Sequence, residues 1–320
     1  MPLLPDTISK LNKVHKLIRP YIIRTPVIES PALNDQCGSQ LFFKCENFQR
    51  VGAFKARGAL HAILRLNKAQ LINGVATHSS GNHAQALAYA AKITNTKAII
   101  VMPENATQAK IDGVKNLGGE IIFCEATLNA REKRLLEVIK QTGAYFVPPY
   151  NHEWIIAGQG TAAKELIEDN PGLDFIIAPV GGGGLLSGTA LAAKLINNQI
   201  SVYGAEPENL NDAQRSFKSG KIEINNPENT TMADGLRTTL GEITLNCILR
   251  YVKDILTVKE SEILESMILM RKHLKITAEP SGAVALAAVV KSKSLFQGKK
   301  VGIIVSGGNI DPTQFPLLKG

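Results

Sequence analysis

The sequence predicts an α/β protein in which parallel sheets are covered by helices on both faces. Short β-branched runs alternate with helical patterns, several of the strand candidates are apolar throughout, and glycine-rich or polar turns follow some of them. Parallel strands need a helix-length crossover, so strand–helix alternation favours parallel sheets. Strands that are apolar along their whole length are typical of sheets buried on both faces.

The length of 320 residues favours two domains. The strand candidates, in chain order, are residues 41–45, 75–78, 98–102, 120–124, 175–180, 202–206 and 301–306. The helical patterns between them cover residues 53–66, 82–94, 106–117, 128–142, 160–168, 185–197, 261–274 and 281–291. Junctions at 67–74 and 148–152 predict a small domain over 67–151 and a discontinuous large domain over 1–66 and 152–320, each a three-layer α/β unit with a mainly parallel sheet.

Composition excludes several classes of protein. Lys and Arg exceed Asp and Glu by 36 − 28 = 8, but the basic residues are not clustered and only 5% of residues are aromatic, which argues against nucleic-acid binding. The four cysteines are far apart and form no CxxC pair, so we expect reduced thiols rather than a zinc site. No secretory signal begins the chain, and the longest apolar run, 283–290, is too short to span a membrane. We therefore expect a cytoplasmic protein.

The turn Gly181-Gly182-Gly183-Gly184 carries the strongest chemical signal. It follows the apolar strand 175–180 and opens the helical run 185–197. Consecutive glycines let backbone N–H groups face one anion, and a helix N-terminus adds partial positive charge. A flexible linker would have polar flanks, so we predict a phosphate cradle. The pattern matches neither the dinucleotide nor the triphosphate fingerprint.

Lys55 lies among small and apolar residues where a helix is predicted to begin. Burial and a helix N-terminus both disfavour an ammonium, so this amine could be neutral and nucleophilic. A surface lysine on an amphipathic helix explains the segment equally well when it is taken alone.

Two more turns are polar. The first, Thr77-His-Ser-Ser-Gly-Asn-His83, suits a carboxylate, although an ordinary helix cap would look the same. The second, Ser306-Gly-Gly-Asn309, follows the last strand candidate and could be a tight loop. Ligands of open α/β sheets bind beyond the carboxyl ends of strands, so the turns together predict one site.

Four ordered motifs, spread over nearly the whole chain, carry a family resemblance: Phe54-Lys-Ala-Arg-Gly-Ala59, Ser79-Ser-Gly-Asn-His83, Gly181–Gly184 and Ser306-Gly-Gly-Asn309. Together they resemble the fold-type II (tryptophan synthase β-like) pyridoxal-phosphate enzymes, in the serine racemase and serine/threonine dehydratase branch. The resemblance implies the cofactor pyridoxal 5'-phosphate and a homodimer. It also implies an ammonia-lyase activity, converting L-serine or L-threonine to a 2-oxo acid and ammonia, together with serine racemase activity.

The resemblance also assigns the cofactor-binding residues. Lys55 would join the cofactor covalently beside Phe54, the phosphate would lie on Gly181, Gly182, Gly183 and Gly184, Asn82 would bind the phenolic oxygen, and Ser306 would meet the pyridine nitrogen with Glu279 nearby. A serine hydroxyl does not keep that nitrogen protonated, so the ring is a weaker electron sink. A weaker electron sink shortens the lifetime of the carbanion that forms when the α-proton is removed. This favours rapid loss of a β-substituent.

The resemblance places the substrate carboxylate on Ser79, Asn82 and His83. Arg131 lies where serine racemases keep a carboxylate-binding arginine, although a solvated helix face would also explain it. Lys55 would remove the α-proton, and Ser80 would act as the second catalytic acid–base on the opposite face, as racemisation requires.

A Mg²⁺ or Ca²⁺ site is implied at Glu206, the carbonyl of Leu210 and Asp212, where oxygen ligands suit a hard cation. Two acids in a loop would mean little without the resemblance. ATP binding stays open, because no residue can be assigned to it. Only nine residues follow Asp311, so no C-terminal regulatory domain is expected.

Other functions remain open at this point. The segment Pro149-Tyr-Asn-His-Glu-Trp154 would line the substrate cavity and could equally suit a threo-3-hydroxyaspartate ammonia-lyase, whose substrate has a second carboxylate. A cysteine synthase would need a different substrate loop. A non-catalytic pyridoxal-phosphate-binding protein would keep the glycine turn but would need neither Ser80 nor the metal carboxylates.

Overall fold

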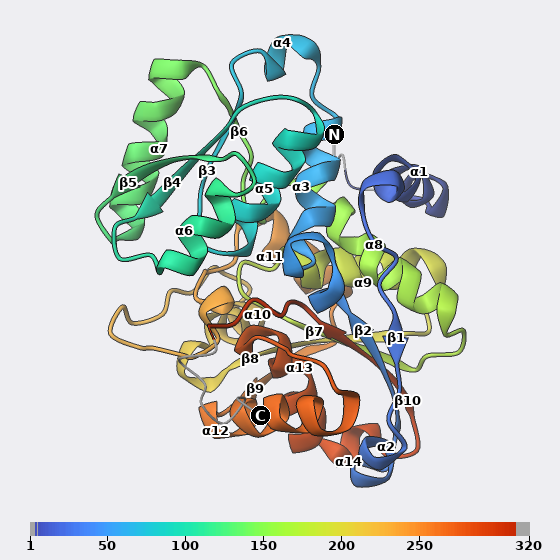
Figure 1. Ribbon diagram of the computed structural model, residues 1–320. Coiled ribbons are helices and arrows are strands. Elements are labelled where there is room, and N and C mark those ends of the chain that lie inside the picture. The colour runs from blue at the N-terminus through green and yellow to red at the C-terminus, as the bar shows by residue number, and fades with distance from the viewer. Residues whose placement is uncertain (1–3, 5, 312–320) are drawn as a thin grey trace.

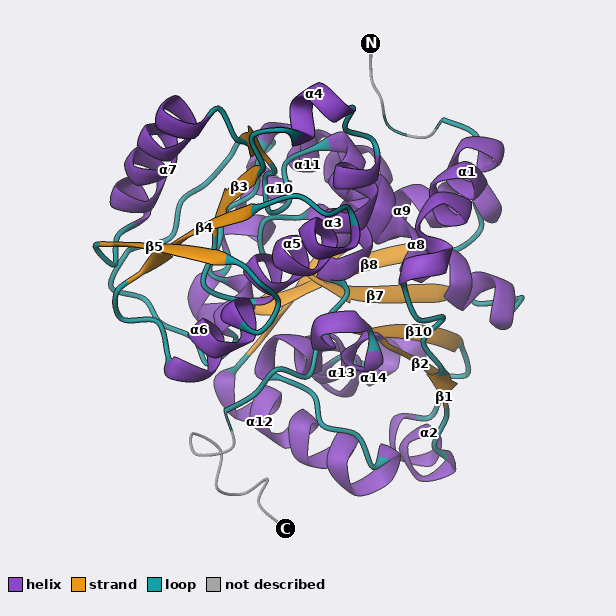
Figure 2. Cartoon of the chain, turned by 45° about the horizontal axis from the view of Figure 1, so that its top comes forward, coloured by secondary structure: helices purple, strands orange, loops and turns teal. Residues whose placement is uncertain are grey.

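Two sheets with helices packed on both of their faces organise the chain in a computed structural model that describes residues 4 and 6–311 (Figures 1 and 2). The smaller sheet has the order β5-β4-β3-β6, and all of its pairs are parallel. The larger sheet has the order β1-β2-β10-β7-β8-β9, in which β1 runs antiparallel to β2 and the other pairs are parallel. The predicted α/β class with mainly parallel sheets is confirmed.

The strands are β1 (Val27–Ile28), β2 (Gln40–Cys45), β3 (Val75–His78), β4 (Ala98–Pro103), β5 (Glu120–Cys124), β6 (Tyr145–Phe146), β7 (Phe175–Pro179), β8 (Ser201–Pro207), β9 (Asp254–Val258) and β10 (Lys300–Val305). The helices are α1 (Ile8–Ile18), α2 (Pro31–Cys37), α3 (Lys55–Leu64), α4 (Lys68–Leu71), α5 (Asn82–Ile93), α6 (Gln108–Lys115), α7 (Leu128–Thr142), α8 (Glu153–Asp169), α9 (Gly184–Ile196), α10 (Asp212–Ser219), α11 (Glu242–Tyr251), α12 (Glu260–Leu269), α13 (Pro280–Lys291) and α14 (Lys293–Phe296). Across the residues that the structure describes, no helix is both long and apolar enough to cross a bilayer.

Successive side chains of a strand point to opposite faces of the sheet, which explains why helices pack on both faces. In β4, Ile99 and Val101 pack with α7, while Ile100 and Met102 pack with α5 on the other face. In β10, Val301, Ile303 and Val305 pack with α13 on one face. Ile304 packs with α8 and α9 on the other face. Both sheets are therefore buried on two faces, as their apolar strands indicate.

Three predicted elements, β3, β5 and α7, are observed with the expected bounds. The prediction was wrong for α8, which begins at Glu153 instead of residue 160. Gly158 and Gly160 look like helix breakers in sequence, but they allow close helix contacts. A Cβ on Gly158 would lie 2.7 Å from the Arg57 carbonyl oxygen, and one on Gly160 would lie 2.6 Å from that of Gly188.

The short strands β1 and β6 were not predicted, and β9 and six helices (α1, α2, α4, α10, α11 and α14) were also missed. A two-residue strand shows no measurable periodicity, so its pairing partner alone defines it. The helix expected over 261–274 changes to a π-helical turn after Leu269. Most of the first five residues, where no secretory signal was expected, and the nine residues after Asp311 lie outside the described residues.

Helix α3 positions the site. Its residues Ala59, Leu60 and Ile63 share one apolar core with Leu87 of α5 and Ile155 of α8. It therefore packs both on a helix that covers the smaller sheet and on a helix that covers the larger one (Figure 1). The division into domains at 67–151 stays a prediction.

Candidate active site

Lys55 is the first residue of α3, and its amine lies against backbone from another segment. The Nζ atom donates a hydrogen bond to the Pro149 carbonyl over 2.7 Å and lies 5.2 Å from the centroid of the Phe54 ring. Burial lowers the Lys55 pKa to about 8, although the Glu279 carboxylate opposes the shift. The amine can therefore lose its proton close to neutral pH, as a nucleophile or a base must.

The turn that follows β10 is joined directly to the residues before Lys55. The Phe54 N–H donates to the Ser306 carbonyl over 3.0 Å, and Ala53 forms a β-bridge with Gly307. A side chain at position 307 would not fit, because a Cβ there would lie 2.6 Å from Glu279 Oε1. Ser306 is 3% exposed, and these backbone contacts bring it next to Phe54, the residue before Lys55.

Asn82 belongs to a hydrogen-bonded set with Glu279 and Asn309. The Asn82 amide donates to Glu279 Oε1 over 2.8 Å, and its own oxygen accepts from Asn309 Nδ2 over 2.8 Å. The Asn309 backbone N–H donates to Glu279 Oε2 over 3.2 Å. Burial raises the Glu279 pKa to about 7, and the bonds from Asn82 and Asn309 limit that shift. Asn309 was expected only as part of a motif, and its hydrogen bond to Asn82 was not predicted.

The glycine turn begins α9. Gly183 precedes the helix with φ of +86°, a conformation that favours glycine, and Gly184 is its first residue. The Tyr150 ring covers this turn, so a Cβ on Gly182 would overlap the Tyr150 ring carbons. The first N–H groups of a helix have no partner within it, so this end can bind an anion. Tyr150 lies in the segment predicted to line the cavity, but its contact with the turn was not predicted.

Replacing Gly182 with alanine should therefore weaken cofactor binding. The added methyl group would push the Tyr150 ring away or distort the turn, and overpacking of this kind costs about 1–3 kcal/mol. We expect the dissociation constant of pyridoxal phosphate, measured by titration of the full chain, to rise roughly tenfold or more. Gly172→Ala, in the loop before β7 and outside the predicted site, is the control for adding a methyl group in open space, because no atom lies within 4 Å of a Cβ there. An unchanged dissociation constant of pyridoxal phosphate in Gly182→Ala would contradict the prediction that the glycine turn binds the phosphate.

The polar turn after β3 leads into α5. Ser79 N–H donates to the Val101 carbonyl over 3.1 Å, and its hydroxyl accepts from Gly81 N–H over 3.3 Å. Ser80 is half-buried beside it. The His83 ring is buried with Nε2 3.2 Å from the Val147 carbonyl oxygen, and burial lowers its pKa to about 3. A neutral, buried imidazole is a weak partner for a carboxylate, so His83 has mainly its backbone N–H to offer a substrate.

Arg131 lies on α7, half-buried, with Nε 3.4 Å from the Thr127 carbonyl oxygen. Burial lowers the pKa of His78 to about 4, and the Arg131 charge adds to this effect. Burial raises the pKa of Tyr150, and the same charge opposes that rise. The guanidinium therefore acts on two side chains next to the polar turn and the glycine turn.

Two buried carboxylates lie at the predicted metal site. Glu206, near the end of β8, accepts from the N–H groups of Ala213 and Gln214 over 3.1 and 2.6 Å. Asp212 accepts from Asn225 with one oxygen, while its Oδ2 is buried with no hydrogen-bond partner. Burial raises the pKa of Glu206 to about 8 and that of Asp212 to about 6.

Leu210 is also buried there, in the short turn Glu208–Leu210 between the two acids. In the described part of the chain, no group of three His, Cys, Asp or Glu side chains is arranged to hold a metal. The orphaned Asp212 oxygen fits a hard cation, which would need further ligands from backbone oxygens and water.

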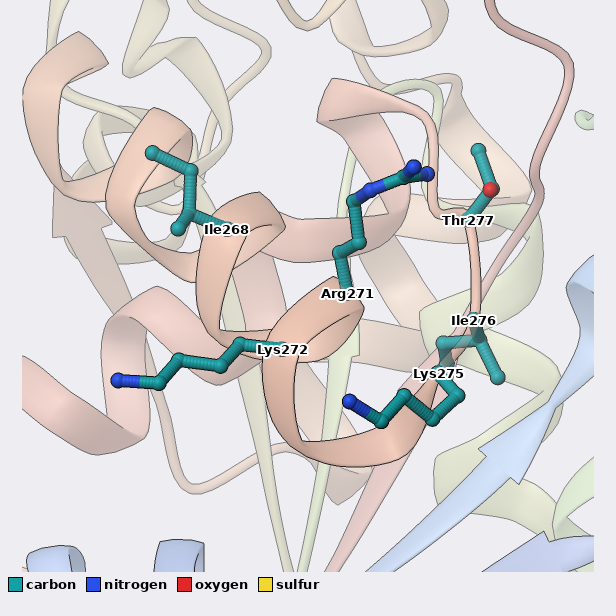
Figure 3. Close-up of a pocket in the computed structure, with 6 residues that line it drawn as sticks. All are labelled: Ile268, Arg271, Lys272, Lys275, Ile276 and Thr277. Carbon is teal, nitrogen blue, oxygen red and sulfur yellow. The ribbon is translucent and has the colours of Figure 1, made fainter. Parts of the chain in front are cut away.

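A cavity of about 470 Å³ lies elsewhere, at the π-helical turn after α12. Figure 3 shows its lining residues, with Arg271 extended toward Thr277 and Lys272 on the other side of the helix. It contains none of the predicted site residues and is not part of the candidate active site.

A family model described as "Pyridoxal-phosphate dependent enzyme" matches residues 18–307. The chain belongs to this family. It is therefore an enzyme, and the family implies pyridoxal phosphate as its cofactor. The predicted resemblance is confirmed.

Three relatives of this pyridoxal-phosphate dependent enzyme have informative names. This chain is 48% identical to a β-hydroxyaspartate dehydratase from Paracoccus denitrificans, and the alignment covers 97% of this chain and 98% of that protein. A crystal structure of serine racemase from Dictyostelium discoideum superposes with a TM-score of 0.90 at 45% identity, covering 95% of this chain and 99% of that one. A crystal structure of threonine deaminase from T.th. superposes with a TM-score of 0.90 at 38% identity, with the same coverage. The expected fold-type II architecture is confirmed.

The residues present fit this cofactor. The half-buried Lys55 amine would supply a covalent partner, the glycine turn at a helix N-terminus would supply an anion cradle, and the oriented Asn82 amide would supply a hydrogen-bond donor for the ring oxygen. Ser306 lies in the same cluster of turns, through its carbonyl contact with Phe54.

Proposed function

We propose that this enzyme removes water from hydroxy amino acids, yielding a 2-oxo acid and ammonia, and that it also racemises serine. The observation that supports this most is Lys55, an amine with a pKa near 8 that is held within one cluster of turns also containing Asn82, Glu279 and Ser306. When bound, pyridoxal phosphate withdraws electrons from the substrate Cα and so makes its proton removable.

The chain's own groups carry the remaining steps of the proposal. The unpaired N–H groups at the start of α5, with the Ser79 hydroxyl, bind the substrate carboxylate. Lys55 Nζ accepts the α-proton and can return it to the departing β-hydroxyl, so that the substrate loses one molecule of water. The released enamine tautomerises and adds water to give the 2-oxo acid and ammonia. Ser80 supplies the proton from the opposite face when the product is the other enantiomer.

Threo-3-hydroxyaspartate is the second candidate substrate. The relative at 48% identity is named for hydroxyaspartate, and the charge of Arg131 contributes to the pKa shifts of Tyr150 and His78, which makes Arg131 the candidate for binding a second carboxylate. A panel of L-serine, D-serine, L-threonine and threo-3-hydroxyaspartate, scored for 2-oxo acid and for the opposite enantiomer, tests both candidates. If none of the four substrates yields either product, the proposed function is wrong.

We also propose that Glu206, Asp212 and the carbonyl of Leu210 bind Mg²⁺ or Ca²⁺. The folded-state pKa values of both acids lie above their ordinary values of 4.5 and 3.8. Without a cation, the free energy of unfolding should therefore fall as the pH rises from about 4 to 8, because the folded state retains protons that the unfolded chain releases.

A cation should remove this penalty, so added Mg²⁺ or Ca²⁺ should raise the melting temperature more at pH 8 than at pH 5. Asp212→Asn should abolish the difference, and Asp254→Asn, which alters a carboxylate outside this pair, is the control. Equal cation effects at the two pH values would contradict the site. Whether the enzyme binds ATP is tested by adding ATP in the same melting experiment, where binding should raise the melting temperature.

A cytoplasmic location and a homodimer are further proposals. All four cysteines are free thiols, which fits a reducing compartment. The homodimer rests on the family resemblance and is checked by sedimentation.

A further inference from the structure

A buried ionic cluster lies beside the first turn of α3. Arg57, two residues after Lys55, places Nε 2.7 Å from Glu46 Oε2 and Nη2 2.7 Å from Glu165 Oε2. Lys44 Nζ lies 2.8 Å from Glu165 Oε2, and His15 Nε2 lies 2.8 Å from Glu165 Oε1. We call these five residues the Arg57 cluster.

The charges of the four fully buried members of the Arg57 cluster balance one another. Arg57, Lys44, Glu46 and Glu165 are all inaccessible to solvent and carry two positive and two negative charges. Burial alone would lower the Arg57 pKa and raise the Glu165 pKa, but their pairing reverses both shifts. Replacing a buried ion pair with apolar residues often changes stability little, so our hypothesis is that this arrangement contributes through the geometry that it imposes.

That geometry links Lys55 to its hydrogen-bond partner. Arg57 belongs to the first turn of α3, and it binds Glu165 of α8 with two nitrogens. Helix α8 begins at Glu153, immediately after the loop whose Pro149 carbonyl accepts the Lys55 amine. Gly158 of α8 contacts the Arg57 carbonyl closely, so the start of α3 is clamped on α8 by backbone and side chain together.

The clamp also reaches the strand that precedes the site. Glu46 follows β2, accepts two bonds from Arg57 over 2.7 and 2.8 Å, and accepts a third from the Thr25 hydroxyl over 2.6 Å. A planar guanidinium can bind both carboxylates at fixed angles, whereas an ammonium has no such fork. Arg57 therefore ties α3 to β2 and α8 at once.

We infer that Arg57 is a positioning residue for Lys55: held between Glu46 and Glu165, it fixes the start of α3 so that the Lys55 amine meets the cofactor aldehyde. This inference rests on the proposed role of Lys55. Arg57 contacts neither cofactor nor substrate in this role, so its removal should impair covalent capture of the cofactor without weakening the glycine cradle.

Two cofactor forms separate those effects. Pyridoxal 5'-phosphate can join Lys55, whereas its alcohol, pyridoxine 5'-phosphate, fills the same cradle but cannot. Both are titrated into the full chain after removal of the cofactor, for wild type, Arg57→Met and Lys44→Met. The last variant is the matched control, because it also removes a buried cation from Glu165 but lies outside α3.

In Arg57→Met we expect the covalent linkage to form roughly a hundredfold more slowly, as for a reacting group displaced by about 1 Å. Its affinity for the alcohol should equal that of wild type, and Lys44→Met should form the linkage at the wild-type rate. Equal losses for aldehyde and alcohol in Arg57→Met, or equal slowing in Lys44→Met, would overturn the inference.

Arg57→Lys keeps the buried positive charge and carries the test should Arg57→Met not fold. It should melt close to wild type yet still form the linkage slowly, so a wild-type rate in this variant would also overturn the inference. A wild-type protein that does not distinguish aldehyde from alcohol would instead overturn the role of Lys55, and with it the proposed function.

Discussion

Replacing Lys55 with alanine should abolish the absorbance of the cofactor–lysine linkage and lower the rate of elimination by about 10⁴-fold. The amine at this position is both the covalent partner and the base for the α-proton in the proposed reaction. It is placed for both by its hydrogen bond to the Pro149 carbonyl. Spectra of the purified full chain with added pyridoxal phosphate, followed by the substrate panel, measure the two effects.

Lys55→Arg is the matched variant. A guanidinium keeps the positive charge but is always protonated, so it can act neither as nucleophile nor as base. It should show the same losses as alanine, while Lys92→Ala, at an exposed position of α5, should resemble wild type. In wild type, the linkage should form faster as the pH rises through about 8, because the neutral amine is the reactive form. A normal spectrum in either Lys55 variant would show that another amine holds the cofactor.

Replacing Ser80 with alanine should separate the two enantiomers of serine. If Ser80 exchanges a proton on the face opposite Lys55, its loss should lower racemisation and D-serine dehydration by about 10²–10⁴-fold. Dehydration of L-serine needs only Lys55 and should change much less. Product assays with each pure enantiomer measure the ratio.

Ser79→Ala is the companion to this experiment. Ser79 is proposed to bind the substrate carboxylate, which both enantiomers share, so its loss should weaken both reactions alike. Equal losses for L- and D-serine in Ser80→Ala would place Ser80 in that same role and remove it from the second face.

The turns that form the candidate site could be located from the sequence because each of them is local in sequence. The four glycines at 181–184 and the turn at 306–309 each follow a buried strand, and parallel strands bring such turns to one edge of a sheet. Asn82 also follows a strand, β3, but its role was assigned from the family resemblance and not from the local pattern. No local pattern, however, indicates that Asn309 holds Asn82 or that Tyr150 covers Gly182, because those contacts join segments far apart in the chain.

The errors in the fold have the same origin. Gly158 and Gly160 reduce helix propensity locally, and their reason for being glycine lies in the backbones of α3 and α9. In the sequence Arg57 was only a member of a motif. Its structural role depends on the carboxylates of Glu46, after β2, and Glu165, in α8. Tertiary packing overrides local preference at these positions.

The position of β10 in the larger sheet has a consequence for how the protein is made. This strand, residues 300–305, is inserted between β2 and β7, although it is the last strand of the described chain to be synthesised. During synthesis, the edge of β2 that pairs with β10 therefore stays unpaired until more than two hundred further residues have been added. The smaller sheet is complete by Phe146 and can form first, whereas a nascent chain released before residue 300 would expose two apolar strand edges to aggregation.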